Sequence, residues 1–316
     1  MSPPTSEVTP ALTVFMFKLA HLSDIHLSPI PHARRRDLLS KRIIGYVNWH
    51  RGRKLVHRRE VLDMLTRDML ARNPDHIAVT GDLVNLGLPE EFKRAAQWLE
   101  ELGPPDHVTA IPGNHDAYVR LNPERGTGLW TPYMEANPAG EELFATPPKG
   151  FPFVRRYGDI ALIALSSAIP TMPFLAAGRV GSTQRSYLAK ALTELGKHDL
   201  FRVVLIHHPP LPGLAPWRRA LRDREKIKKI LKECGAELAL HGHNHEGSVE
   251  QIETISGLCS VVGVPSASEA MDDGEPAAGY NEYCISRVNS GWQCEMGIRS
   301  ASREGRTWES RTLILR

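Results

Sequence analysis

Five short apolar segments of this chain are each followed at once by polar residues of the same few kinds. Aspartate, asparagine and histidine come directly after the apolar residues, in "SDIHL", "GDLVN", "GNHD", "IHHPP" and "HGHNH". Apolar runs of this length, between turn residues, are typical of buried strands. Because loops that leave parallel strands converge at one edge of a sheet, we expect these polar residues to meet in a single pocket.

The segments between the polar clusters predict helices. Apolar residues recur at helical spacing over about residues 61–73, 89–102, 182–195 and 217–234, while the chain beyond 247 has the pattern of meander strands. Alternating strands and helices indicate an α/β fold. No linker divides the chain, so we expect a flexible tail at residues 1–14 and one domain over residues 15–316.

The clustered residues suit a pair of divalent cations. Asp24 and His26 lie on the same side of a segment if it is extended, and His243 and His245 repeat this spacing. Oxygen and imidazole donors without cysteine argue against a thiolate zinc site. A carboxylate such as Asp82 can bridge two metal ions about 3.5 to 4 Å apart and hold a hydroxide between them as the nucleophile.

The five clusters resemble, in order, the signature of the calcineurin-like metallophosphoesterase superfamily: DxH, GDxx, GNHD, a histidine after a later strand, and GHxH. The match spans about residues 18–250 and looks most like the bacterial branch of class III cyclic-nucleotide phosphodiesterases and glycerophosphodiesterases. Purple acid phosphatases carry a tyrosine where this chain has Asn85, so no tyrosinate-to-iron colour is expected. The resemblance implies a four-layer α/β/β/α sandwich of two mixed sheets, with the strands of residues 247–316 completing the second sheet.

The resemblance also implies a role for each clustered residue. His115 would face the phosphoryl group, where it stabilises charge or protonates the leaving oxygen, and Asp116 would orient its imidazole. His208 and Asn85 would contact substrate or support the ligands. The two ions would be Mn²⁺, Fe²⁺/Fe³⁺ or Zn²⁺. The implied ligands are Asp24, His26, Asp82 and His245 for one metal, and Asp82, Asn114, His207 and His243 for the other.

The implied reaction is hydrolysis of a phosphodiester by in-line attack of the bridging hydroxide, without a covalent enzyme intermediate. Two alternatives stay open from the sequence. One is a lipid-linked pyrophosphohydrolase similar to the UDP-diacylglucosamine pyrophosphohydrolase branch, acting at a membrane surface. The other is a phosphate-binding scaffold that keeps the fold without activity. Polar residues that merely cap strand ends would explain any one cluster, but not five ordered ones.

A basic insert, residues 30–59, follows the first cluster. Ten Lys and Arg residues lie between Arg34 and Arg59 with one acidic residue, although the whole chain has a net charge of only +3. The insert could pack through its apolar residues with its cations in water, overhang the metals as a lid, or contact an anionic membrane. The acidic remainder of the chain disfavours nucleic acid as a partner. The segment 268–283 is expected to be a loop near the pocket mouth.

The remaining features predict no further function. The N-terminal segment lacks the pattern of a signal peptide, and no apolar run has the length of a membrane span, so we expect a cytoplasmic protein with at most peripheral membrane contact. Four cysteines without a CxxC pair indicate reduced, packed thiols. The other histidines are interpreted as surface or core residues: His21, His32, His50, His57, His76, His107 and His198.

Overall fold

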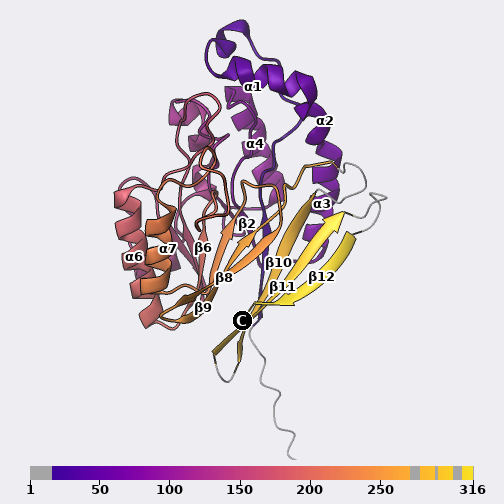
Figure 1. Ribbon diagram of the computed structural model, residues 1–316. Coiled ribbons are helices and arrows are strands. Elements are labelled where there is room, and N and C mark those ends of the chain that lie inside the picture. The colour runs from indigo at the N-terminus through magenta and orange to yellow at the C-terminus, as the bar shows by residue number, and fades with distance from the viewer. Residues whose placement is uncertain (1–15, 271–277, 289–290, 302–307, 316) are drawn as a thin grey trace, which may run out of the picture.

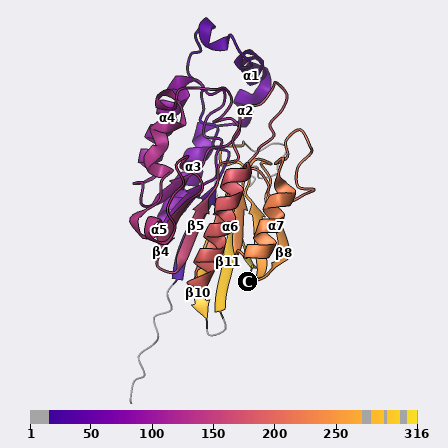
Figure 2. The same ribbon diagram turned by 90° about the vertical axis from the view of Figure 1, so that its left-hand side faces the viewer.

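Two six-stranded sheets pack face to face, and helices cover the outer face of each sheet (Figures 1 and 2). The computed structural model describes residues 16–270, 278–288, 291–301 and 308–315. Buried hydrophobic clusters lie between each sheet and its helices and between the two sheets. The predicted four-layer α/β/β/α sandwich is therefore confirmed.

The first sheet contains both the beginning and the end of the described chain. Its elements are β1 (Met16–Leu22), β2 (His76–Val79), β3 (Val108–Ala110), β10 (Gly279–Val288), β11 (Gly291–Ala301) and β12 (Trp308–Ile314), covered by α3 (Arg59–Ala71) and α4 (Pro89–Leu102). The strand order is β12-β11-β10-β1-β2-β3, parallel between β1, β2 and β3 and antiparallel elsewhere. Leu65 of α3, Leu99 of α4 and Val79 belong to one buried cluster.

The second sheet is built from the middle of the chain. Its elements are β4 (Phe153–Tyr157), β5 (Ile160–Ala164), β6 (Phe201–Leu205), β7 (Leu238–His241), β8 (Ser248–Thr254) and β9 (Gly257–Gly263), covered by α6 (Ser182–Lys197) and α7 (Arg224–Cys234). The strand order is β4-β5-β6-β7-β9-β8, and β5, β6, β7 and β9 run parallel. Strands β1, β2 and β3 of one sheet and β6 and β7 of the other thus supply the five polar clusters.

The expectation that all strands after residue 247 complete the second sheet is wrong for β10, β11 and β12. Only β8 and β9 join that sheet, whereas β10 pairs antiparallel with β1. The register places Ile285 beside Phe17 and Tyr283 beside Leu19, and all four side chains are buried between the sheets. The last strands therefore close the free edge of β1, an edge that periodicity within β10 could not identify.

The basic insert folds into short helical turns that project beyond the strand ends, at the top of Figure 1. They are η1 (Arg35–Leu38), α1 (Arg42–Asn48), the π-helix η2 (Trp49–Arg53) and α2 (Lys54–Val56). The segment 120–150 holds η3 (Pro123–Arg125), η4 (Thr127–Tyr133) and α5 (Pro138–Leu143). None of the described helices combines the length and the hydropathy that a membrane span requires.

Candidate metal centre

Five of the seven predicted ligands project from left-handed turns just beyond the strand ends. Asp24, His26, Asp82, His243 and His245 have φ angles of 53°, 41°, 56°, 72° and 63°. Such angles cost a residue other than glycine on the order of 1 kcal/mol or more, so the surrounding structure must impose them. The expectation that the first pair extends from a straight segment is wrong, because β1 ends before it and the backbone turns at both residues.

The loops after β2 and β3 approach so closely that glycine is required in both. A Cβ atom on Gly81, where φ is 103°, would lie 2.5 Å from the backbone nitrogen of Gly113. A Cβ atom on Gly113 would in turn overlap the carboxylate of Asp82. The glycines of "GDLVN" and "GNHD" therefore allow the carboxylate to lie between the two loops.

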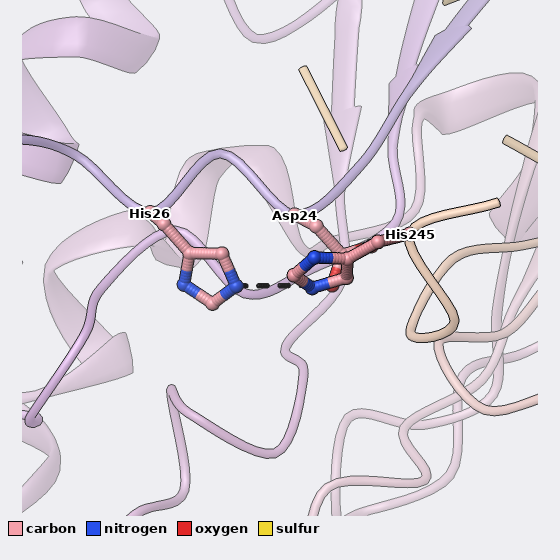
Figure 3. Close-up of side chains that lie close together, drawn as sticks. All are labelled: Asp24, His26 and His245. Atoms are coloured by element: carbon pink, nitrogen blue, oxygen red, sulfur yellow. Dashed lines mark ion pairs between the residues drawn. The ribbon is translucent and has the colours of Figure 1, made fainter. Parts of the chain in front are cut away.

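Asp24, His26 and His245 converge in one group (Figure 3). The Oδ1 atom of Asp24 lies 4.0 Å from Nε2 of His26 and 3.3 Å from Nε2 of His245. Donor atoms at these separations can share one ion bonded to each at about 2.0 to 2.2 Å. The structure thus brings together three of the four ligands predicted for the first metal.

A second group forms around the other carboxylate. Oδ2 of Asp82 lies 3.5 Å from Nε2 of His207 and 3.9 Å from Nε2 of His26. Oδ1 of Asn114 lies 3.1 Å from the same nitrogen of His207. Asp82 therefore lies between the two groups, as a bridging carboxylate would.

The hydrogen bonds of the imidazoles fit metal binding. The Nδ1 atom of His26 lies 3.2 Å from the carbonyl oxygen of Val84, and that of His207 lies 2.7 Å from the carbonyl oxygen of Thr80. Acceptors at Nδ1 hold the proton there and leave Nε2 as the donor to a metal, as is usual for metal-bound histidine. Nδ1 of His245 similarly lies 3.0 Å from Oε2 of Glu269. The residues present thus fit two metal ions.

Two buried carboxylates dominate the charge of the site. The residues Asp24 and Asp82 are 0% and 2% exposed. Burial acts to raise the pKa of Asp24, but the imidazoles of His245 and His207 outweigh it and hold that pKa below its usual range. Burial acts to lower the pKa of both histidines, yet Asp82 raises the pKa of His207 to about 9 and Asp24 raises the pKa of His245 to about 9. The pocket is therefore built to hold positive charge.

His115 and Asp116 follow Asn114, but they act on different partners. His115 donates its backbone N–H to Oδ1 of Asp82 over 2.7 Å, and its Nδ1 lies 2.6 Å from the carbonyl oxygen of Asn85. The Asp116 carboxylate instead accepts four backbone N–H groups of the loops after β2 and β3. The prediction that Asp116 orients the imidazole is therefore wrong: the Asn85 carbonyl does so.

His208, His243 and Asn85 have structural partners. His208 is buried, with Nδ1 2.7 Å from Oγ of Ser167 and Nε2 3.1 Å from the carbonyl oxygen of Ala176. The side-chain amide of Asn85 donates to the carbonyl of Leu27 over 3.0 Å. Nε2 of His243 lies 2.9 Å from the carbonyl oxygen of Arg219, which leaves Nδ1 as the atom that can reach a metal. His243 lies outside the described donor groups, so its role as a ligand stays a prediction.

The same pocket has a volume of about 470 Å³ and is also lined by several residues that the sequence did not single out, among them Arg53 of the insert, His57, Arg219 and Glu269. His57, interpreted from the sequence as a surface or core residue, is buried with its ring centroid 4.4 Å from that of His26. No local pattern distinguishes Arg53 among the ten cations of its segment.

Comparison with known proteins agrees with this geometry. The model of the calcineurin-like phosphoesterase family matches residues 17–247. A probable cyclic nucleotide phosphodiesterase of Synechococcus sp. is 30% identical over 212 residues, which are 66% of this chain and 71% of that protein. A glycerophosphodiester phosphodiesterase of Enterobacter lignolyticus is 29% identical over 253 residues, which are 77% of each chain.

Solved structures share the fold at low sequence identity. A dimetal phosphatase from Danio rerio aligns with a TM-score of 0.57 and 13% identity, over 95% of this chain and 99% of that one. A purple acid phosphatase from yellow lupin (Lupinus luteus) seeds aligns with a TM-score of 0.51 and 12% identity, over 95% of this chain and 54% of that one. With the family matched over most of the chain and metal donors assembled at the strand ends, this protein is a metal-dependent phosphoester hydrolase that belongs to the calcineurin-like phosphoesterase family.

Proposed function

We propose that this protein is a dinuclear metal-dependent phosphodiesterase. The observation that carries the proposal is the buried carboxylate of Asp82, which lies between His26 of one donor group and His207 of the other. A carboxylate in that place can bridge two ions. The names of the relatives, a cyclic nucleotide phosphodiesterase and a glycerophosphodiester phosphodiesterase, support a diester as the substrate class.

Bound metal ions would neutralise phosphoryl oxygens and lower the pKa of water to near neutral, and the donor set accepts Mn²⁺, Fe²⁺/Fe³⁺ or Zn²⁺. Asp24, His26, Asp82, Asn114, His207, His243 and His245 would hold these ions. The Nε2 atom of His115 faces the pocket beside them, because Nδ1 is bound to the Asn85 carbonyl. In the reaction, oxygen from water forms a bond to phosphorus while the bond to the alkoxide opposite breaks. A proton taken up on that Nε2 would let His115 stabilise the developing charge.

Hydrolysis of bis(p-nitrophenyl) phosphate with added Mn²⁺, Fe²⁺ or Zn²⁺ tests the proposal. Asp82→Ala should abolish turnover, and His115→Ala should reduce kcat about 100-fold, the usual effect of losing one such group. His198→Ala removes a half-exposed histidine just after the end of α6 and should change nothing. A folded wild-type protein with no turnover under any of the three metals would instead favour a non-catalytic phosphate-binding scaffold.

A second candidate function is action on a lipid-linked pyrophosphate at a membrane surface. The observation that favours it is a set of exposed apolar side chains at the strand-end edge. Leu39 of the insert is 86% exposed, Phe174 of the β5–α6 loop is 79% exposed and Trp217 of the β6–α7 loop is 71% exposed. Exposed aromatic and aliphatic groups beside basic residues are typical of proteins that insert into an anionic membrane surface. The pocket opens among these same loops.

Only part of the basic insert is available for such contact. Arg34, Arg35 and Arg36 are exposed, whereas Arg42 is buried and Lys41 donates to the carbonyl of Thr171 over 3.1 Å. Sedimentation with phosphatidylcholine vesicles, with and without phosphatidylglycerol, tests the contact. The wild-type chain should pellet with the anionic vesicles, and a chain with Arg34, Arg35 and Arg36 replaced by glutamine should not. Equal, negligible pelleting of both chains would remove the membrane candidate.

A further inference from the structure

The basic insert delivers one arginine into the metal pocket. Arg53 ends the π-helix η2, a form of helix that is rare and often marks a functional site. Trp49, at the start of this turn, is buried and anchors it. The insert therefore points the side chain of Arg53 inward, while Arg51 of the same turn stays exposed.

The guanidinium of Arg53 donates to two imidazole nitrogens of the pocket. Nη1 lies 3.3 Å from Nε2 of His115, and Nη2 lies 3.2 Å from Nε2 of His26. The nitrogen of His26 is also the donor atom that the first metal group needs. A metal bound there takes the acceptor away from Nη2. One arm of the guanidinium is then left without a partner, in a pocket that phosphoryl oxygens would enter.

The charge of Arg53 is not used in an ion pair. In the described part of the chain, its side-chain hydrogen bonds go to imidazoles, and no carboxylate lies within 4.0 Å of its nitrogens. The carboxylates of Asp82 and Asp24 attract this largely buried cation without hydrogen-bonding to it, so it lacks the direct anionic partner that would offset its burial. Arginine binds phosphoryl oxygen with charge-assisted hydrogen bonds and a planar fork, so such an oxygen is the natural partner here.

The position of Arg53 is fixed from both sides of the insert. On one side, Nε of Arg42 donates to the carbonyl of Leu86 over 3.1 Å. On the other side, the backbone N–H of Arg58 donates to the carbonyl of Ser268 over 2.9 Å, and Nδ1 of His57 lies 3.0 Å from Oγ of the same serine. A donor held in place before the substrate arrives loses little entropy on binding.

We propose that Arg53 binds a non-bridging oxygen of the substrate phosphoryl group, so that the basic insert completes the active site. This inference rests on the proposed phosphodiesterase function and adds to it a binding residue that the superfamily signature in this sequence does not contain. Of the three interpretations of the insert, it supports the one in which the insert overhangs the metals.

Binding of inorganic phosphate by the metal-loaded protein, measured by calorimetry at saturating Mn²⁺, tests Arg53 without requiring turnover. Arg53→Gln should weaken phosphate binding about 10- to 100-fold, the usual effect of losing a charge-assisted bond. Arg53→Lys, which keeps the charge but not the fork, should lose less. Arg51→Gln is the matched control and should bind phosphate as the wild type does. Metal content, measured by elemental analysis, should be equal in all four proteins.

Two results of these binding measurements would overturn the inference. One is wild-type phosphate affinity in Arg53→Gln. The other is loss of metal together with phosphate in both Arg53 variants, because Arg53 would then support the ligands and not the substrate. Steady-state kinetics on bis(p-nitrophenyl) phosphate separates this inference from the proposed function. Equal turnover in wild type and Arg53→Gln would refute only the role of Arg53 in substrate binding. Absent turnover in the wild type would refute the proposed phosphodiesterase function, and the phosphate titration would then still test the role of Arg53.

Discussion

Replacing Asp116 by asparagine should weaken the hydrogen bonds that hold the loop of Asp82 in place. Oδ2 of Asp116 accepts the backbone N–H groups of Asp82 and Gly113, both over 2.8 Å. Oδ1 accepts those of Leu83 over 3.0 Å and Val84 over 3.1 Å. Asparagine has nearly the same shape, but its amide nitrogen cannot accept a hydrogen bond. Two of the four backbone donors would therefore face another donor.

The size of the effect follows from these contacts. A buried backbone donor left without an acceptor costs about 1 to 3 kcal/mol. Two lost bonds give at most about 6 kcal/mol, and movement of the loop recovers part of it. We expect Asp116→Asn to lower the free energy of unfolding by about 3 to 5 kcal/mol. Displacement of Asp82 should also weaken metal binding at least about tenfold.

Guanidinium chloride unfolding of the metal-free protein, followed by tryptophan fluorescence, measures the stability. Calorimetric titration with Mn²⁺ measures metal binding. His115→Ala is the control, because it removes the neighbouring imidazole and leaves the Asp116 carboxylate in place, so it should cost only about 1 kcal/mol. If Asp116→Asn matched wild type in stability and metal affinity and lowered kcat alone, Asp116 would act on His115 and not on the loop of Asp82.

Two other predictions concern the support of a metal ligand and the titration of a buried histidine. Glu269→Ala removes the carboxylate that accepts a hydrogen bond from Nδ1 of His245. This substitution should weaken metal binding by about 10- to 100-fold, measured by calorimetry. Glu246→Ala, on the same pocket wall, is the control and should leave metal binding unchanged. Burial lowers the pKa of His21 to about 3, so between pH 6.5 and 3 the unfolded chain binds a proton that the folded chain does not, and stability is lost as the pH falls. Denaturant unfolding with a chelator should show a loss of about 2 kcal/mol from this residue between pH 7 and pH 5, and His21→Gln should show a smaller loss than wild type. An equal pH dependence in both proteins would contradict the assignment.

Local sequence pattern was enough to predict most of the elements. The helices expected over about residues 61–73, 89–102 and 182–195 correspond to α3, α4 and α6. Helix α7 begins at Arg224 instead of about residue 217. The periodicity of apolar residues is a local property, set by which side chains of one helix or strand face the core. It could therefore be read without knowing the partners of each element.

The metal-binding side chains were also predictable, because their residue types and their positions after predicted strands can both be recognised in the sequence. Their directions were not. Asp24 and His26 converge through left-handed turns that hydrogen bonds to the loop after β2 impose: the backbone N–H of Asp24 donates to Gly81 and that of His26 donates to Asp82. A turn of this kind depends on a partner more than 50 residues away, so local pattern predicted an extended segment instead.

Sequence by itself determined the fold class, the family and the kinds of atom that meet at the strand ends, since these depend on side-chain type and local spacing. Only the tertiary structure decided that β10 closes the edge of β1, that Asp116 supports the loop of Asp82, and that Arg53 alone of ten cations in the insert enters the pocket. Each of these depends on contacts between segments far apart in the chain. Such contacts are selected by the packing of the whole molecule, because the sequence of one segment does not specify which distant surface will pack against it.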